Sequence, residues 1–146
     1  MPHPLHEFFT PKTLAVLGAS DRAGSIGRQV LTQLHAHQCA EHIIPINPNH
    51  KIIGGQKAFE NLTEAAQEIY IDVVIVVLAA DKLNGIVREA AKLNIKNIIL
   101  INDLDTLNNS IRNKLDRAND TAKKANIQLL AVPSGALFQL FKQPEN

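Results

Sequence analysis

Residues 72–78 read DVVIVVL, and after the aspartate every side chain in this stretch is apolar, with four valines and an isoleucine among them. A strand with one face in water alternates apolar and polar side chains, whereas a strand covered on both faces is apolar throughout. The stretch therefore predicts a central strand of a parallel sheet. Four other apolar runs are shorter or less uniform, and we expect them to be strands of the same sheet: residues 13–18, 42–48, 97–102 and 127–132.

The segments between these runs have helical spacing. Ile26, Val30 and Leu34 recur every four residues in the first segment, and Asn61 or Thr63 is a candidate N-cap for the second. The expected helices span residues 25–38, 61–69, 81–94 and 103–125, and residues 135–141 (GALFQLF) form a short helical or turn-like tail.

Five strands alternating with four helices predict an α/β fold, in which a doubly wound, Rossmann-like parallel sheet carries helices on both faces. We expect residues 1–146 to form a single domain. The expected strand order is the Rossmann order 3-2-1-4-5, and the flavodoxin-like order is the alternative. In both orders a ligand binds beyond the carboxyl ends of the strands, at the point where the strand order reverses.

Composition narrows the class of protein. The 146 residues are 45% hydrophobic, and the formal net charge of +1 argues against a general binder of nucleic acid or membrane surfaces. The lone cysteine, Cys39, excludes an internal disulfide, and we expect it at the end of a helix. No apolar run approaches the length of about 20 residues that spans a bilayer. The N-terminus lacks the features of a signal peptide, so we expect a soluble, cytoplasmic protein.

Residues 16–27, VLGASDRAGSIG, join the first strand to the first helix. Their glycines are spaced G-x5-G-x2-G, which differs from the G-x-G-x-x-G of dinucleotide sites. The start of a helix offers free N–H groups and a partial positive charge, and both suit a phosphate. Candidate ligand residues of this loop are Gly18, Ser20, Arg22, Gly24, Ser25 and Gly27. The alternative is that Gly18 only ends the strand and Gly27 only lets the helix pack on the sheet.

The second loop, residues 46–51, reads INPNHK. An NAD site places a carboxylate about 20 residues past the glycines, where it accepts hydrogen bonds from the ribose. Asn47 lies near that position here, and the loop holds His50 and Lys51 but no carboxylate. This chemistry favours a phosphorylated ribose, as in NADP or CoA. For each basic residue alone, a solvated loop is the alternative.

The remaining polar residues give no catalytic signature. We expect Asp81 to cap the third helix, and Asn102, Asp103 and Asp105 to lie near the start of the fourth. The histidines are expected at the surface, and we identify neither a metal cluster nor a paired nucleophile and base. The sequence thus predicts binding rather than catalysis.

Taken together, several motifs resemble a known family. They are F-x-P-K (Phe9, Pro11, Lys12), V-x-G-A-S at 16–20, P-x-N-P at 45–48, Gly54 with KAF at 57–59, and the apolar run at 72–78. The chain resembles the CoA-binding domain at the N-terminus of NDP-forming acyl-CoA synthetases. It is similar to the front of the succinyl-CoA synthetase α subunit and to the domain that bacterial protein lysine acetyltransferases fuse to a GNAT domain.

The resemblance implies a Rossmann-type fold that holds CoA in three loops. It assigns CoA contacts to Gly18, Ala19, Ser20, Arg22, Gly24, Ser25, Ile26 and Gly27 in the first, to Asn47, Pro48, Asn49 and Lys51 in the second, near the adenosine, and to Leu78 and Ala79 in the third. The chain departs from the family at INDLD (101–105) and at AVPSG (131–135).

The resemblance also implies a division of labour. The synthetases need a phosphorylated histidine and an ATP-grasp module, and the acetyltransferases need a GNAT domain. We therefore expect a domain that binds CoA or acyl-CoA without catalysing a reaction alone, either by itself or beside such a partner domain. Two alternatives are an NADP-binding oxidoreductase or redox-sensor domain, and a regulatory scaffold that has lost its ligand. The apolar tail at 135–141 predicts a homodimer.

Overall fold

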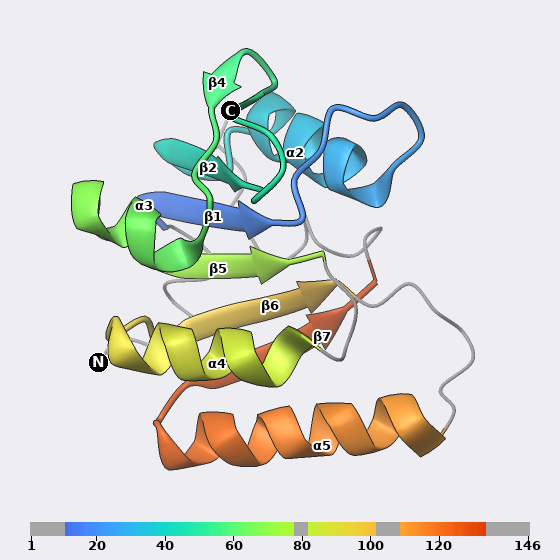
Figure 1. Cartoon of the computed structure of the whole chain (residues 1–146), viewed down its shortest axis with the longest axis vertical. Helices are drawn as coiled ribbons and strands as arrows, with labels where there is room; N and C mark the ends of the chain where they lie inside the picture. The colour runs from blue at the N-terminus through green and yellow to red at the C-terminus, as the bar shows by residue number, and fades with distance from the viewer. Residues whose placement is uncertain (1–10, 78–81, 102–108, 134–146) are drawn as a thin grey trace, which may run out of the picture.

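The computed structural model of the chain describes residues 11–77, 82–101 and 109–133, with side chains at all of these except 109–111. In these residues five parallel strands form one sheet, and their arrowheads point the same way in Figure 1. They are β1 (Thr13–Leu17), β2 (His42–Ile46), β5 (Val73–Val76), β6 (Asn97–Ile101) and β7 (Gln128–Val132). All five lie where the sequence predicts strands.

The strand order is β2-β1-β5-β6-β7, which is 2-1-3-4-5 when only these strands are counted. The expected order 3-2-1-4-5 is wrong, and the flavodoxin-like alternative is the one observed. β5 pairs directly with β1, from Leu14 opposite Val73 to Leu17 opposite Val76. β2 is therefore an edge strand. Pro45 lies within it, and this fits an edge position, because proline has no N–H to donate to a further strand.

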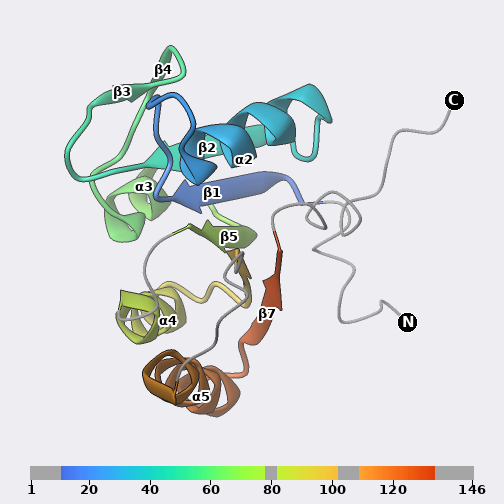
Figure 2. The same cartoon turned by 90° about the vertical axis from the view of Figure 1, so that its right-hand side faces the viewer.

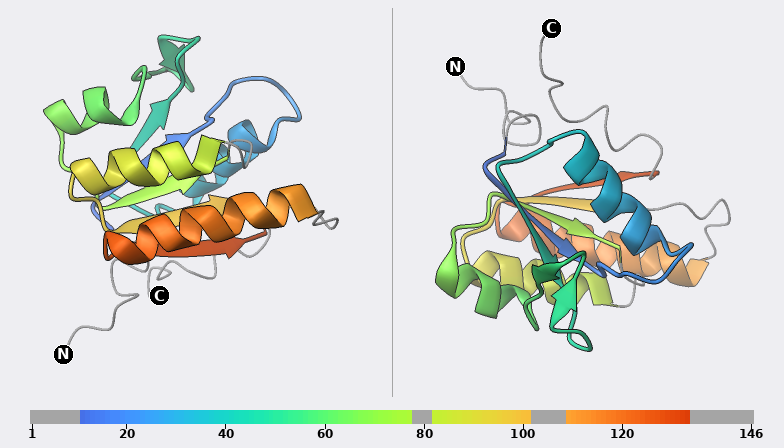
Figure 3. Two further views of the ribbon diagram at one scale, coloured as in Figure 1. Left: turned by 60° about the horizontal axis from the view of Figure 1, so that its bottom comes forward. Right: turned by 90° about the horizontal axis from the view of Figure 1, so that it is seen from above.

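Four helices lie in the described residues, each within or beside a predicted helix: α2 (Ile26–Ala36), α3 (Leu62–Glu68), α4 (Leu83–Lys92) and α5 (Asn109–Lys124). Figure 3 shows α4 and α5 on one face of the sheet and α2 on the opposite face. Asn61 is the N-cap of α3, and its side chain accepts a hydrogen bond from the N–H of Glu64. The predicted cap Asp81 lies outside the described residues.

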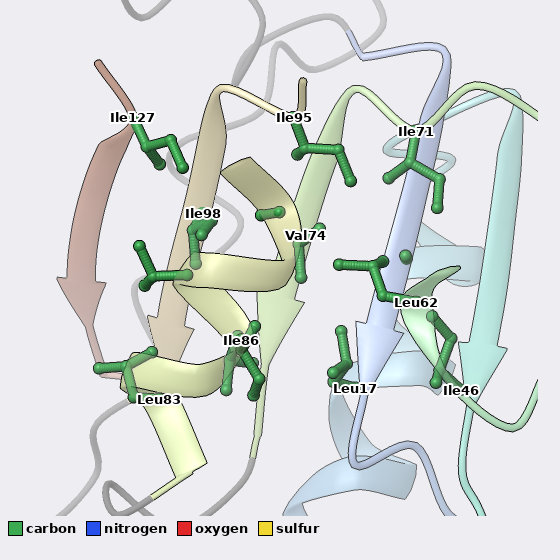
Figure 4. Close-up of a cluster of buried hydrophobic side chains, with 14 of the residues drawn as sticks. Leu17, Ile46, Leu62, Ile71, Val74, Leu83, Ile86, Ile95, Ile98 and Ile127 are labelled. Carbon is green, nitrogen blue, oxygen red and sulfur yellow. The ribbon is translucent and has the colours of Figure 1, made fainter. Parts of the chain in front are cut away.

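Side chains of the central strand enter two apolar clusters. Val74 and Val76 join the cluster beneath α3, α4 and α5, which Figure 4 shows, and Val73 and Ile75 join the cluster beneath α2. All four are fully buried. This confirms the central position that the run at 72–78 predicts, because only a strand covered on both faces buries consecutive side chains.

Three of the helices end in the same way. Gln38, Asn94 and Asn126 have φ values of 50°, 60° and 58°, and the residue after each is buried. The N–H of that next residue bonds back across the last turn, as Cys39 does to the carbonyl of Leu34. This is the Schellman arrangement, and it places Cys39 at a helix end as predicted.

A small hairpin that the strand analysis did not predict follows β2. It pairs β3 (Ile52–Ile53) with β4 (Gln56–Lys57) in antiparallel fashion around Gly54 and Gly55. Both glycines have positive φ, at 62° and 74°. Two adjacent glycines between short strands are a known hairpin signal, so the stretch 52–57 (IIGGQK) did contain it.

Candidate functional site

The strand order reverses at β1, because the chain leaves β1 through α2 on one face and leaves β2 through α3 on the other. Ligands of doubly wound sheets bind at such a point, beyond the carboxyl ends of the strands. Figure 2 shows the first turn of α2 beside the carboxyl end of β1. Two of the predicted loops, residues 18–25 and 47–51, lie at this edge. The third contains Leu78 and Ala79, which lie outside the described residues.

Gly18 and Gly27 bring the start of α2 against the end of β1. A Cβ atom placed on Gly27 would lie 2.1 Å from the carbonyl oxygen of Gly18. Gly18 itself has a φ of 88°, a conformation that favours glycine. Close packing of helix on strand therefore accounts for Gly27, and the positive φ accounts for Gly18. Gly24 has a φ of 81° with no atom near its missing Cβ, so its backbone conformation is what favours glycine there.

The first turn of α2 is capped by Ser25, whose Oγ accepts a 3.1 Å hydrogen bond from the N–H of Arg28. The N–H of Ser25 is itself bonded to the carbonyl of Arg22. The next two N–H groups, of Ile26 and Gly27, have no acceptor within the helix, and no partner for them is found in the described residues. These two groups are free donors at the start of α2.

Two hydrogen bonds tie the first loop to the segment after β2. The Nδ2 of Asn47 donates to the carbonyl oxygen of Ala19 at 2.9 Å. Asp21 Oδ1 accepts from the N–H of Gly54 in the hairpin at 2.8 Å. Asn47 Oδ1 also accepts from the N–H of Asn49 at 2.8 Å. Both ends of the Asn47 amide are thus engaged with protein, and Asp21 is a loop-positioning residue that sequence reasoning missed.

The second loop borders a hollow of about 380 Å³. Its lining has charges of both signs, because His50 and Lys51 line it together with Glu60 and Glu64. Lys57 lines it too, but its Nζ is bound to Glu68 at 3.2 Å and lies 4.8 Å from the centre of the Phe59 ring. No partner for the Lys51 side chain is found in the described part of the chain. Of the predicted residues, this hollow contains Asn47, Pro48 and Lys51.

A separate hollow of about 340 Å³ lies along the first turns of α2 and is lined by Gly24, Ser25, Arg28, Gln29, Thr32 and Gln33. Of the residues predicted to contact CoA, Gly24 and Ser25 line this hollow, and Asn47, Pro48 and Lys51 line the other; the two hollows share no lining residue. The exposed side chain of Arg22 lies in the loop before α2. Ala19 is buried and meets the second loop through its carbonyl group.

The cysteine Cys39 is free and buried. Burial raises the pKa of the Cys39 thiol to about 11, which keeps it protonated and unreactive at neutral pH. The described side chains include no group of three or more His, Cys, Asp or Glu that could hold a metal ion. In the same residues no helix combines the length and hydropathy that crossing a bilayer requires.

Comparison with known proteins adds a family. Residues 12–134 match the family described as the CoA binding domain. A 4-hydroxybutyrate–CoA ligase (ADP-forming) of Nitrosopumilus maritimus is 25% identical over 122 residues, which are 83% of this chain. The chain spans only 17% of that ligase.

Solved structures show the same fold. The apo form of the dinucleotide-forming acetyl-coenzyme A synthetase 1 of Candidatus Korarchaeum cryptofilum matches with a TM-score of 0.74 and 22% identity, over 89% of this chain and 28% of that one. A conserved hypothetical protein from Pyrococcus furiosus matches with a TM-score of 0.67 and 19% identity, over 82% of this chain and 92% of that one. The architecture therefore occurs both inside a synthetase and as nearly the whole of another chain of solved structure.

Proposed function

The chain belongs to the family of CoA binding domains, and on this basis we propose that it binds CoA or an acyl-CoA at the carboxyl ends of β1 and β5. The pyrophosphate lies on the first turn of α2, and the adenosine end lies toward the second loop. The residues proposed to contact or shape the ligand site are Gly18, Ala19, Ser20, Arg22, Gly24, Ser25, Ile26, Gly27, Asn47, Pro48, Asn49, Lys51, Leu78 and Ala79.

The free N–H groups of Ile26 and Gly27 are the observation that best supports the proposal. They lie at the positive end of an 11-residue helix, and a phosphate there accepts their hydrogen bonds and meets a favourable dipole. The exposed guanidinium of Arg22 supplies a full charge nearby in sequence. In the proposed arrangement the N–H of Ser25 takes no part, since it is bonded to Arg22, but the Ser25 hydroxyl can still donate.

Lys51 supports the assignment of the adenosine end. Lys51 lines the hollow at the second loop, and the loop itself has no carboxylate that would repel a phosphate on the ribose. Glu60 and Glu64 also line the hollow, and its basic side chains besides Lys57, which is bound to Glu68, are Lys51 and His50. CoA carries such a phosphate on its 3′ oxygen.

We propose that this domain supplies binding and that bond making belongs to other domains. The ligase relative is a much longer protein, of which this chain matches 17%. An ATP-grasp module or a GNAT domain is the partner that the proposal favours. A homodimer stays a prediction, because the tail at 135–141 lies outside the described residues. Sedimentation that shows only monomer at high concentration would remove it.

The competing function is NADP binding by an oxidoreductase or redox-sensor domain, and the missing carboxylate of the second loop favours it equally. A ligand-free scaffold is the third possibility. Calorimetric titration with CoA, acetyl-CoA, NADPH and NADH separates the three. We expect both CoA species to bind more tightly than either nicotinamide cofactor. Tighter binding of NADPH than of either CoA species contradicts the proposal. If none of the four ligands gives a heat of binding, the result supports the ligand-free scaffold.

A further inference from the structure

Ile26 is the exposed end of an otherwise buried apolar stripe on α2. The apolar stripe of α2 continues through Val30 and Leu34, whose side chains are 1% and 0% exposed, whereas that of Ile26 is 40% exposed. Residues four apart lie on the same face of a helix, and this face of α2 packs on the sheet. Ile26 is thus the end of the core-facing stripe, and it is left without the cover that the other two have.

The position of Ile26 follows from the direction of α2. The helix begins beside the carboxyl end of β1 and runs back along the sheet, so its first turn lies at the carboxyl edge (Figures 1 and 2). On the same face of the sheet, Val77 and Val132 follow or end β5 and β7 and are only partly buried. This edge therefore presents incompletely covered apolar side chains on the α2 side.

Ile26 also supplies one of the two free N–H groups on which we place the pyrophosphate. A single residue then offers a donor to the phosphate and an apolar surface beside it. In CoA the pyrophosphate joins the adenosine to a pantetheine arm, whose first carbons carry two methyl groups. In NADP it joins the adenosine to a second ribose, which is polar. The apolar surface therefore matches CoA on the side of the phosphates away from the adenosine.

We propose that Ile26 is a specificity residue that packs on the branched start of the pantetheine arm and disfavours a second ribose. This inference rests on the proposed CoA binding. Removing the side chain beyond Cβ takes away apolar contact with pantetheine and leaves the backbone N–H in place. The loss should therefore appear with CoA and be absent with 3′-phosphoadenosine 5′-diphosphate, which has the adenosine and all three phosphate groups of CoA but no pantetheine.

The experiment measures both ligands against wild type and four variants by calorimetry. We expect Ile26→Ala to weaken CoA by about five- to tenfold, which corresponds to the burial of part of one apolar side chain. Ile26→Val should retain most of the affinity, and Ile26→Thr, of nearly the same shape but with a hydroxyl, should lose it as alanine does. Ile52→Ala is the matched truncation of another exposed isoleucine, 67% exposed on β3, and should change nothing.

Each outcome separates the two proposals. If wild type binds no CoA, the proposed function fails and this inference fails with it. If wild type binds CoA and Ile26→Ala binds it equally well, or weakens both ligands by the same factor, only the inference is overturned. If Ile26→Thr matches Ile26→Val, the contact does not depend on apolar chemistry and the inference is also overturned. Circular dichroism before titration checks that every variant is folded.

Discussion

The side-chain amide of Asn47 donates a 2.9 Å hydrogen bond to the carbonyl oxygen of Ala19 and thereby joins the loop after β2 to the loop after β1. The two residues lie 28 positions apart in the sequence. The same amide accepts the N–H of Asn49 through its oxygen. Asn47 therefore acts as a bridge between the two loops, and its effect on a ligand passes through the loops that it holds.

Asn47→Ala should lower the free energy of unfolding by about 1–2 kcal/mol, because it removes two hydrogen bonds and leaves the carbonyl of Ala19 without its partly buried partner. The same change should weaken CoA binding, because the first loop is displaced. Chemical denaturation and calorimetry measure the two effects. Asn49→Ala is the control for stability alone, because only the backbone of Asn49 is bonded to Asn47. Equal losses of stability in both variants would contradict the bridge.

Gly27→Ala should be strongly destabilising, by about 3 kcal/mol or more, because the added methyl overlaps the carbonyl of Gly18 and forces α2 from the strand end. Gly85 gives a matched control within α4, since a Cβ there meets no atom within 4 Å. Gly85→Ala should raise the free energy of unfolding by about 0.5–1 kcal/mol through better helix propensity. Thermal unfolding of the pair tests the close approach, and two variants that change stability in the same direction would refute it.

Lys51→Ala should weaken CoA about tenfold and leave 3′-dephospho-CoA unchanged, because a charge-assisted hydrogen bond to the 3′-phosphate is lost. The difference should shrink as salt screens the charges. Lys57→Ala is the control: its ammonium group borders the same hollow but is already bound to Glu68. A loss of equal size with both forms of CoA would place the phosphate elsewhere.

The buried thiol of Cys39 should make the stability of the fold depend on pH in alkaline solution. Burial raises the pKa of its thiol from 9.0 to about 11 in the folded chain. The folded state therefore holds the proton more tightly than the unfolded state. The stability that this provides is complete below pH 9 and declines as the pH rises through about 11. Denaturation curves of wild type and Cys39→Ala measured across this range should converge as the pH rises, and parallel pH profiles would show that the thiol contributes nothing.

Much of the fold follows from local pattern. The run at 72–78 predicts a doubly covered strand, and its burial confirms it, because continuous apolar sequence has few other solutions. Strand order is harder to predict from the sequence. It depends on which strand pairs with β5, and the spacing of apolar residues does not specify that partner. Pro45 was the available clue, because a proline inside β2 indicates an edge strand. The hairpin at 52–57 was missed because strands of two residues carry almost no periodicity.

Only part of the candidate site can be predicted from the sequence. The glycines and Ser25 could be located from their place between a strand and a helix. Asp21 could not, because its partner is a backbone N–H 33 residues away. The exposure of Ile26 was hidden for a similar reason. Its spacing from Val30 and Leu34 predicts burial, and only the end of the strands below it leaves it uncovered.

The segment after the hairpin has a consequence for how this sheet can grow. Phe59 accepts the N–H of Asn47 and donates to the carbonyl of Pro45, while the side chain of Gln56 donates to the carbonyl of Ile43. Along with the proline, these bonds occupy the outer border of β2 and leave little there for a foreign strand to pair with. This border of β2 is therefore protected against pairing with a strand of another chain, which is a common route to aggregation for edge strands. Among the described residues, the other border of the sheet is that of β7.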